Sequence, residues 1–141
     1  MWHWQNAMIT KDGKRTPHYD MVSHINTQLQ QVGDVLLDRQ SLAVFHIGTV
    51  PDKKVTYWQG SFGDVTSMDA ACITAGFFEG DMMLLANKDY ELPQSVTFTV
   101  AEGKAVQKLN KQSGIWEMLT PTDGTYTLTL AAGDGELLRI V

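Results

Sequence analysis

The apolar pattern of the chain changes its period near Ser41, and this change restricts the possible folds more than any other feature of the sequence. Upstream of Ser41, apolar residues project at about 100° per residue onto one stripe roughly 100° wide, which is typical of a helix that packs through one face. These residues are Met21, Val22, Ile25, Leu29 and Val32. Downstream, apolar residues alternate with threonine at 96–100 and 125–130, which indicates strands with one buried face. We therefore predict a mainly β fold, an antiparallel β-sandwich preceded by one amphipathic α-helix.

The predicted helix has recognisable ends. Thr16 suits the N-cap position and Pro17 suits the first helical position. Gly33 is placed to end the helix as a left-handed C-cap, and residues 34–38 can add one further short turn. Because a lone helix cannot bury its own apolar stripe, this helix must pack on the sandwich or on another domain.

The remaining strands are predicted from short apolar or β-branched runs that turn residues separate. They cover residues 42–47, 55–58, 72–78, 82–86, 105–109, 115–119 and 137–141. Residues 79–81 (Glu-Gly-Asp) and 110–114 are expected to form hairpin turns. Strands at this spacing favour a sandwich or a barrel. The chain thus divides into residues 1–40, which form a strand end, a loop and a helix, and residues 41–141, which form the sandwich domain.

Charge and cysteine content exclude several classes of function. The chain has 16 acidic and 11 basic residues and a net charge of −5, whereas nucleic acids and anionic membranes attract basic surfaces. Cys72 is the one cysteine, so neither an intrachain disulfide nor a multi-cysteine zinc site is expected. The longest weakly polar stretch, residues 70–78, is too short to span a bilayer. We expect no nucleic-acid partner, no membrane partner and no cofactor.

Candidate catalytic and metal-binding side chains do not form a recognisable constellation. Several aspartates stand beside a glycine, which is typical of turns. They are Asp12, Asp64, Asp81, Asp123 and Asp134. His18 and His24 are six residues apart and point to different helix faces, whereas metal-binding pairs use a spacing of three or four. We therefore predict no catalytic carboxylate pair and no metal site in this chain.

Aromatic residues are the strongest candidates for a binding site. Tyr57 and Trp58 precede a loop, and Trp116 falls on a predicted hairpin strand. Aromatic faces flanked by a few polar groups can hold a sugar, and such groups are available in Gln59, Asp64 and Asn87. The simpler interpretation is that Trp58 and Trp116 fill the sandwich core or cover its edge.

Two stretches carry motifs that occur together in one protein family. The first contains Trp2-His3-Trp4, the loop Lys-Asp-Gly-Lys-Arg-Thr at 11–16, and Tyr19, Val22, Ile25-Asn26, Leu29, Val32-Gly33 and Leu36-Leu37. It resembles the last strand and last helix of the (β/α)₈ barrel in β-galactosidase-like glycoside hydrolases of the clan with two catalytic glutamates. The second contains Gly76-Phe77-Phe78, Leu-Leu-Ala-Asn-Lys-Asp at 84–89 and Leu-Ala-Ala-Gly-Asp-Gly at 130–135. It is similar to the C-terminal β-sandwich of such proteins from gut bacteria of Bacteroides type.

The resemblance implies a role without chemistry of its own. In the family, the catalytic glutamates lie on earlier barrel strands, so no catalytic residue is carried over to this chain. Trp2 or Trp4 resembles the aromatic residue that lines the sugar cleft at the end of the last barrel strand. The two tryptophans at the start of the chain lead us to expect a piece of a longer protein. The resemblance also implies a parent protein in the periplasm or at the cell surface.

Three hypotheses for the function follow. In the first, the chain is the C-terminal accessory domain of a glycoside hydrolase, and it packs on the catalytic barrel. In the second, the sandwich is a carbohydrate-binding module that uses Tyr57, Trp58 or Trp116 as a stacking platform. In the third, it is a small stand-alone interaction domain, and a second copy of the chain covers the apolar helix face in a homodimer.

Overall fold

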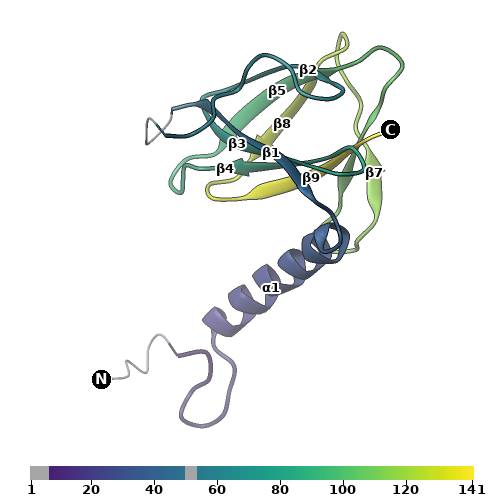
Figure 1. The fold of residues 1–141 in the computed structure, drawn as a ribbon. Helices are drawn as coiled ribbons and strands as arrows, with labels where there is room; N and C mark the ends of the chain where they lie inside the picture. Colours follow the sequence, from purple (N-terminus) through teal and green to yellow (C-terminus); the bar gives the residue numbers. More distant parts are fainter. Residues whose placement is uncertain (1–6, 50–53) are drawn as a thin grey trace.

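The computed structural model describes residues 7–49 and 54–141 and shows one helix followed by two packed β-sheets (Figure 1). The helix is α1 (Pro17–Leu36). The strands are β1 (Ser41–Gly48), β2 (Val65–Ala70), β3 (Cys72–Phe78), β4 (Met82–Asn87), β5 (Gln94–Val100), β6 (Val106–Leu109), β7 (Trp116–Met118), β8 (Tyr126–Leu130) and β9 (Gly135–Ile140). The predicted fold class, a mainly β antiparallel sandwich preceded by one helix, is confirmed.

The two sheets differ in size. The larger sheet has the strand order β1-β3-β4-β9-β6-β7, and the smaller sheet has the order β2-β5-β8. All of these pairings are antiparallel. Both predicted hairpins are present, because β3 pairs with β4 around residues 79–81 and β6 pairs with β7 around the loop that contains residues 110–114. β9 lies between β4 and β6, so the last strand occupies the middle of the larger sheet.

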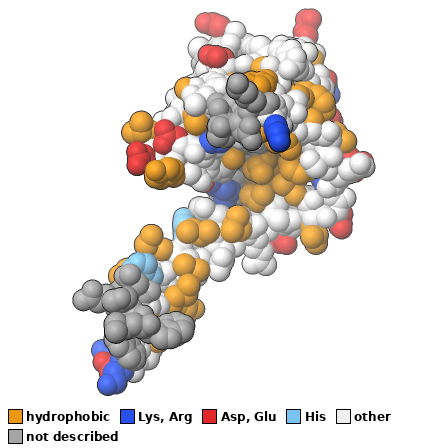
Figure 2. All heavy atoms as spheres, turned by 60° about the vertical axis from the view of Figure 1, so that its left-hand side comes forward, with side chains coloured by type: hydrophobic (Ala, Val, Ile, Leu, Met, Phe, Trp, Pro, Cys, Tyr) orange, Lys and Arg blue, Asp and Glu red, His pale blue; other side chains and the backbone are white. Residues whose placement is uncertain are grey.

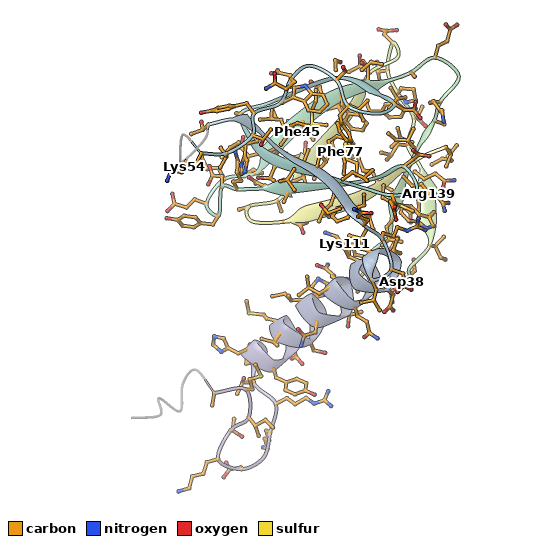
Figure 3. The ribbon with its side chains drawn as sticks, viewed as in Figure 1. Asp38, Phe45, Lys54, Phe77, Lys111 and Arg139 are labelled. Atoms are coloured by element: carbon orange, nitrogen blue, oxygen red, sulfur yellow. The ribbon has the colours of Figure 1, made fainter. Side chains whose placement is uncertain are left out.

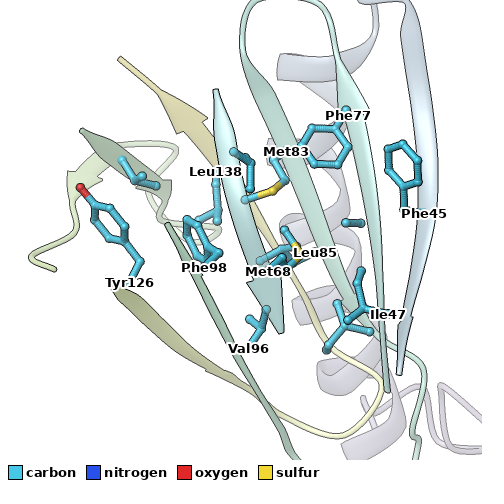
Figure 4. Close-up of a cluster of buried hydrophobic side chains, with 14 of the residues drawn as sticks. Phe45, Ile47, Met68, Phe77, Met83, Leu85, Val96, Phe98, Tyr126 and Leu138 are labelled. Carbon is cyan, nitrogen blue, oxygen red and sulfur yellow. The ribbon is translucent and has the colours of Figure 1, made fainter. Parts of the chain in front are cut away.

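The main core lies between the two sheets, where Figure 4 shows inward-pointing side chains from both. Val96 and Phe98 are buried on β5, and the ring of Phe98 stacks on Tyr126 of β8 with centroids 5.4 Å apart. The threonines between the buried residues of β5 and β8 lie on the opposite, outer face of the smaller sheet. The predicted alternation of buried and outward residues therefore holds on both strands.

α1 continues three residues beyond Gly33, so the predicted C-cap at Gly33 is wrong. Val35 and Leu36 lie in the last turn and pack against apolar side chains on the outer face of the larger sheet. A glycine inside a helix costs only about 1 kcal/mol, and burial of two aliphatic side chains outweighs that cost. The helix begins as predicted with Pro17 after Thr16, although the Thr16 hydroxyl donates to the carbonyl oxygen of Ala7 (2.6 Å) instead of capping α1.

Residues 55–58 do not form the predicted strand. Tyr57 makes one parallel bridge to His46 of β1, in which His46 N donates to Thr56 O (2.9 Å) and Trp58 N donates to His46 O (3.1 Å). The sequence also did not predict β2. Its two buried residues, Val65 and Met68, are three positions apart because a bulge shifts the pairing with β5 between Val65 and Ser67, and this removes the period of two.

The buried side chain of Asn87 joins three segments at one end of the sandwich. Its Nδ2 donates to Leu92 O and to Ala131 O, both at 2.9 Å, and its Oδ1 accepts from Asp89 N at 2.9 Å. The segment before β5 and the turn after β8 are thereby tied to the end of β4. Asp89 continues the network, because its Oδ1 accepts from Glu91 N (2.9 Å) and Leu92 N (3.0 Å).

We predict that Asn87→Ala lowers the free energy of unfolding by about 2 kcal/mol, because two carbonyl oxygens lose a buried donor. Urea unfolding measures this change. Asn26→Ala, on the exposed side of α1, is the matched control and should change the free energy by less than about 0.5 kcal/mol. Equal effects of the two substitutions would show that the Asn87 bonds do not stabilise the sandwich.

We also predict a stability contribution from Asp89 that depends on pH. The backbone bonds from Glu91 and Leu92 hold the pKa of Asp89 below its ordinary value of 3.8. The contribution is therefore present above that value and is lost as the pH falls through the lower folded pKa. Asp89→Asn keeps an acceptor oxygen and removes the charge. Urea unfolding of both proteins from about pH 6 to about pH 3 should show their stability difference shrinking, and a constant difference would contradict this role.

Candidate functional site

A groove of about 330 Å³ lies between α1 and the outer face of the larger sheet. Half of its lining residues are aliphatic, and they come from both sides: Ile25, Leu29, Val32, Leu84 and Ala86. Lys111 and the turn at residues 133–135 form its polar end. Figure 2 shows apolar side chains along the helix and on the sandwich above it. Such a surface suits the burial of an apolar group better than recognition of a polar one.

The C-terminal part of α1 attaches the helix to the sandwich. Val32, Val35 and Leu36 pack on a small cluster outside the larger sheet, whose buried members are Met82, Leu109 and Leu137. Towards its N-terminus the helix projects away from the sheets (Figure 1). α1 therefore has one docked end and one end that extends beyond the sandwich.

Polar contacts fix the docked end. Arg39 follows α1, and its Nε donates to Val35 O while its Nη1 donates to Glu79 O, both at 3.2 Å. These bonds join the end of the helix to the turn between β3 and β4. Gln31 of α1 lies against Gly114 in the loop between β6 and β7, where a Cβ atom would meet the Gln31 amide. Gly114 also has a φ of +71°, so a larger residue is excluded there on two grounds.

The apolar stripe of α1 continues beyond the docked end. Met21, Ile25 and Leu29 are 60%, 49% and 64% exposed, although they follow the stripe that Val32 and Leu36 continue onto the sandwich. No residue of α1 is fully buried. A stripe of this size, exposed on one helix face, is typical of a surface that another protein covers.

The polar end of the groove is an ion-pair network. Figure 3 labels Lys111 between the sandwich and α1. Its Nζ lies 2.7 Å from Asp134 Oδ1, 2.7 Å from Gly135 O and 3.5 Å from Glu136 Oε1. Lys108 Nζ lies 3.9 Å from the same Glu136 oxygen, whereas Glu136 Oε2 is buried without a hydrogen-bond partner among residues 7–49 and 54–141. Because the Lys111 ammonium already faces three oxygen atoms, it is poorly placed to bind an anionic ligand.

The aromatic residues predicted for sugar binding lie in different environments. Trp58 is half-buried and packs against the main core at the edge of the sandwich. Its ring centroid lies 5.4 Å from that of Phe45 and 6.0 Å from that of Phe77. Tyr57 next to it is 47% exposed. Trp2 and Trp4 lie outside the residues that the structure describes.

Trp116 lies far from this pair. It belongs to β7, at the opposite edge of the larger sheet from β1, and packs on the outer cluster beneath α1. The guanidinium carbon of Arg139 sits 4.5 Å from its ring centroid, so one face of the indole is covered. The structure therefore does not bring Trp116 together with Tyr57 and Trp58 in one platform.

The polar groups proposed to assist sugar binding are engaged elsewhere. Asn87 is buried in the network described above. Asp64 pairs with Lys104 at 3.0 Å, and the Gln59 amide donates to Tyr57 O at 3.1 Å. Asp81 and Asp123 have positive φ values of 58° and 47° and occupy turns, as predicted for aspartates beside glycine.

His46, Cys72 and Lys88 lie near one another at one end of the larger sheet. Lys88 N donates to Cys72 O (3.1 Å), and Lys88 Nζ donates to Thr49 O (2.7 Å). Burial, and then the charge of Lys88, lower the pKa of His46, which favours the neutral imidazole. His46 Nδ1 lies 3.3 Å from Thr74 Oγ1, but in the described part of the chain no carboxylate contacts the imidazole to orient it as a catalytic base.

No set of three or more histidine, cysteine, aspartate or glutamate side chains that could hold a metal ion occurs within the described ranges. In the same ranges, no helix is both long and apolar enough to cross a membrane. Comparisons with protein-family models, with curated proteins and with solved structures gave no match.

We predict that Trp58→Ala lowers the free energy of unfolding by about 3 kcal/mol, because the indole packs among core aromatic rings. Tyr57→Ala removes a more exposed ring at the neighbouring position and should cost less than about 1 kcal/mol. Urea unfolding of both variants gives the comparison. If Trp58→Ala were as stable as Tyr57→Ala, Trp58 would not be a packing residue and its ring would be free for a ligand.

Proposed function

We propose that the chain is a non-catalytic accessory module of a glycoside hydrolase-like protein and that the sandwich packs on the catalytic barrel of that protein. The observation that carries the proposal is the difference between the two outer faces of the sandwich. The outer face of the larger sheet carries an apolar cluster and an apolar row, whereas the outer face of the smaller sheet carries a group of hydroxyl side chains.

An apolar row crosses the larger sheet. Val44, Gly76, Leu84 and Leu137 are neighbours in register on β1, β3, β4 and β9. α1 covers the Leu137 end of the row, whereas Val44 at the other end is 47% exposed. An open row of this kind beside an exposed helix stripe is suited to packing against a second folded body.

The opposite outer face favours water. Ser67 and Thr99 share a hydrogen bond of 2.6 Å between their hydroxyl oxygens, and Thr66 Oγ1 lies 2.7 Å from Thr99 Oγ1. Ser95 and Thr129 approach to 3.3 Å on the same face. This polar face needs no cover, so the module has one side suited to docking and one side suited to solvent.

Two further observations support a structural role. The carboxylates of Asp64, Asp134 and Glu136 pair with lysines instead of facing one another across a cleft. Asn87 and Asp89, which belong to a motif of the resemblance, form the network that joins β4 to the neighbouring turns. Neither group of residues offers a catalytic pair.

We predict that Val44→Asp weakens the attachment of the module to its parent protein while the module itself stays folded. A charge placed on an exposed docking surface loses contact with an apolar partner but costs little stability, about 1 kcal/mol or less. Limited proteolysis of the native protein should release the module several-fold faster in this variant. Thr127→Asp, on the hydroxyl-covered face, is the control and should leave the rate unchanged.

The size of the native protein decides the proposal as a whole. An immunoblot with an antibody to the sandwich should give a band several times heavier than 15.7 kDa. A band at 15.7 kDa would overturn the accessory-module proposal. In that case, quenching of tryptophan fluorescence by a polysaccharide would test the carbohydrate-binding hypothesis on Tyr57 and Trp58.

A further inference from the structure

A short antiparallel turn precedes α1, and its two arms are held side by side. Ile9 and Arg15 form an antiparallel bridge, and Thr16 N donates to Met8 O at 3.0 Å. The Thr16 hydroxyl donates to Ala7 O at 2.6 Å. Figure 1 shows the two ends of this turn meeting near the start of α1. Traced backwards from Ile9 to Ala7, the first arm therefore points in the direction in which the second arm enters the helix.

A second groove, of about 280 Å³, lies along α1 next to this turn. Its lining includes Met8 of the turn and Tyr19, Val22, Ser23 and Gln30 of the helix. None of these residues lines the groove between α1 and the larger sheet, so the two grooves lie on different sides of the helix. Tyr19 and Val22 are half-buried and form its apolar part, whereas Ser23 and Gln30 are exposed and polar.

Met8 indicates which side chains of the preceding segment can face this groove. In an extended chain, residues two positions apart point to the same side. Trp4 and Trp2 lie four and six positions before Met8, and His3 and Gln5 alternate with them. An extended continuation of the first arm would therefore direct both indoles into the groove and the alternating polar side chains away from it.

The length of the preceding segment matches the length of the groove. From Tyr19 to Gln30 the helix rises about 17 Å. Six residues in an extended conformation span about 20 Å, which is enough to follow the groove. Measured from the end of the first arm, Trp4 can reach about 10 Å along the helix, level with Val22, and Trp2 can reach about 17 Å, towards Gln30.

The groove also suits the chemistry of an indole. Tryptophan has a large apolar ring system and one N–H donor, which needs an acceptor when it is buried. Tyr19 and Val22 offer apolar contact, and the hydroxyl of Ser23 and the amide of Gln30 offer acceptor oxygens. The guanidinium carbon of Arg15 lies 4.6 Å from the centroid of the Tyr19 ring and covers one face of it. A segment that is already joined to the turn binds without the entropy loss of a bimolecular association.

We propose that the N-terminal segment (residues 1–6), which lies outside the described residues, binds in extended form in the groove along α1, with Trp4 against Val22. Trp2 and Trp4 then act as packing residues and not as sugar-binding residues. The inference does not depend on the proposed function, because it uses only contacts within residues 1–30. In a longer parent protein, the polypeptide before residue 1 would join beside the middle of α1 instead of at the end that projects from the sandwich.

Nuclear Overhauser spectroscopy of the isotope-labelled 141-residue protein is the first test. We expect cross-peaks between the indole protons of Trp4 and the methyl groups of Val22, because binding in the groove brings these groups into contact. Cross-peaks from Trp4 to Leu29 in place of Val22, or no cross-peaks from either N-terminal tryptophan to α1, would overturn the proposal.

Cleavage by chymotrypsin after Trp4 measures how often the N-terminal segment leaves the groove, because the protease cuts the open form. Val22→Asp places a charge beneath the indole and should speed this cleavage about tenfold. Met21→Asp is the matched control, because Met21 is 60% exposed and does not line this groove. Equal rates in the wild-type and Val22→Asp proteins, or equal acceleration by the two substitutions, would contradict binding in this groove.

The outcomes separate this inference from the proposed function. A heavy native band together with no contact between Trp4 and Val22 would remove the inference and leave the accessory role. The contact together with a native band of 15.7 kDa would keep the inference and remove the role in a hydrolase.

Discussion

Aliphatic burial on the outside of a sheet determines how the helix and the sandwich are joined. Met82, Leu109 and Leu137 point away from the main core, so the fold needs a cover on this side of the larger sheet. The last turns of α1 provide that cover, and the bonds of Arg39 hold them in place. The last turns of α1 contact the cluster, and the rest of the helix extends beyond it. The groove and the exposed apolar stripe lie along this remaining part of the helix.

The outer faces of the two sheets differ in chemistry, so the two sides of the sandwich are not equivalent. On the smaller sheet, hydroxyl side chains of β2, β5 and β8 bond to one another across the strands. On the larger sheet, an apolar row passes from under α1 to the exposed side chain of Val44. A sandwich with one apolar outer face and one hydroxyl-rich outer face can be placed in a larger assembly in few ways, because the apolar face favours contact with protein and the hydroxyl-rich face favours contact with water.

Local sequence patterns predicted much of the fold and little of the site. The bounds of β3 and β8 follow closely from the sequence, because β3 is a largely buried run and the residues of β8 alternate between the core and the exposed face. β2 was not predicted, because its bulge breaks the alternation of buried and exposed residues. α1 continues beyond Gly33 because its last turn packs on residues that are distant in the sequence. Trp58 and Trp116 were selected by residue type, but their separation depends on strand order, which the local pattern does not encode. The outward-facing Leu137, together with Val35 and Leu36 after Gly33, was the available signal for the groove.

The central place of β9 in the larger sheet sets an order for assembly of the protein. β9 contacts β4 on one side and β6 on the other, so without it the sheet separates into β1-β3-β4 and β6-β7. During synthesis, the earlier strands leave the ribosome before β9. Until β9 emerges, β4 and β6 each lack the strand that pairs with them in the complete sheet. Because this closing contact joins residues far apart in the sequence, the sandwich is expected to fold slowly and only after β9 has been made.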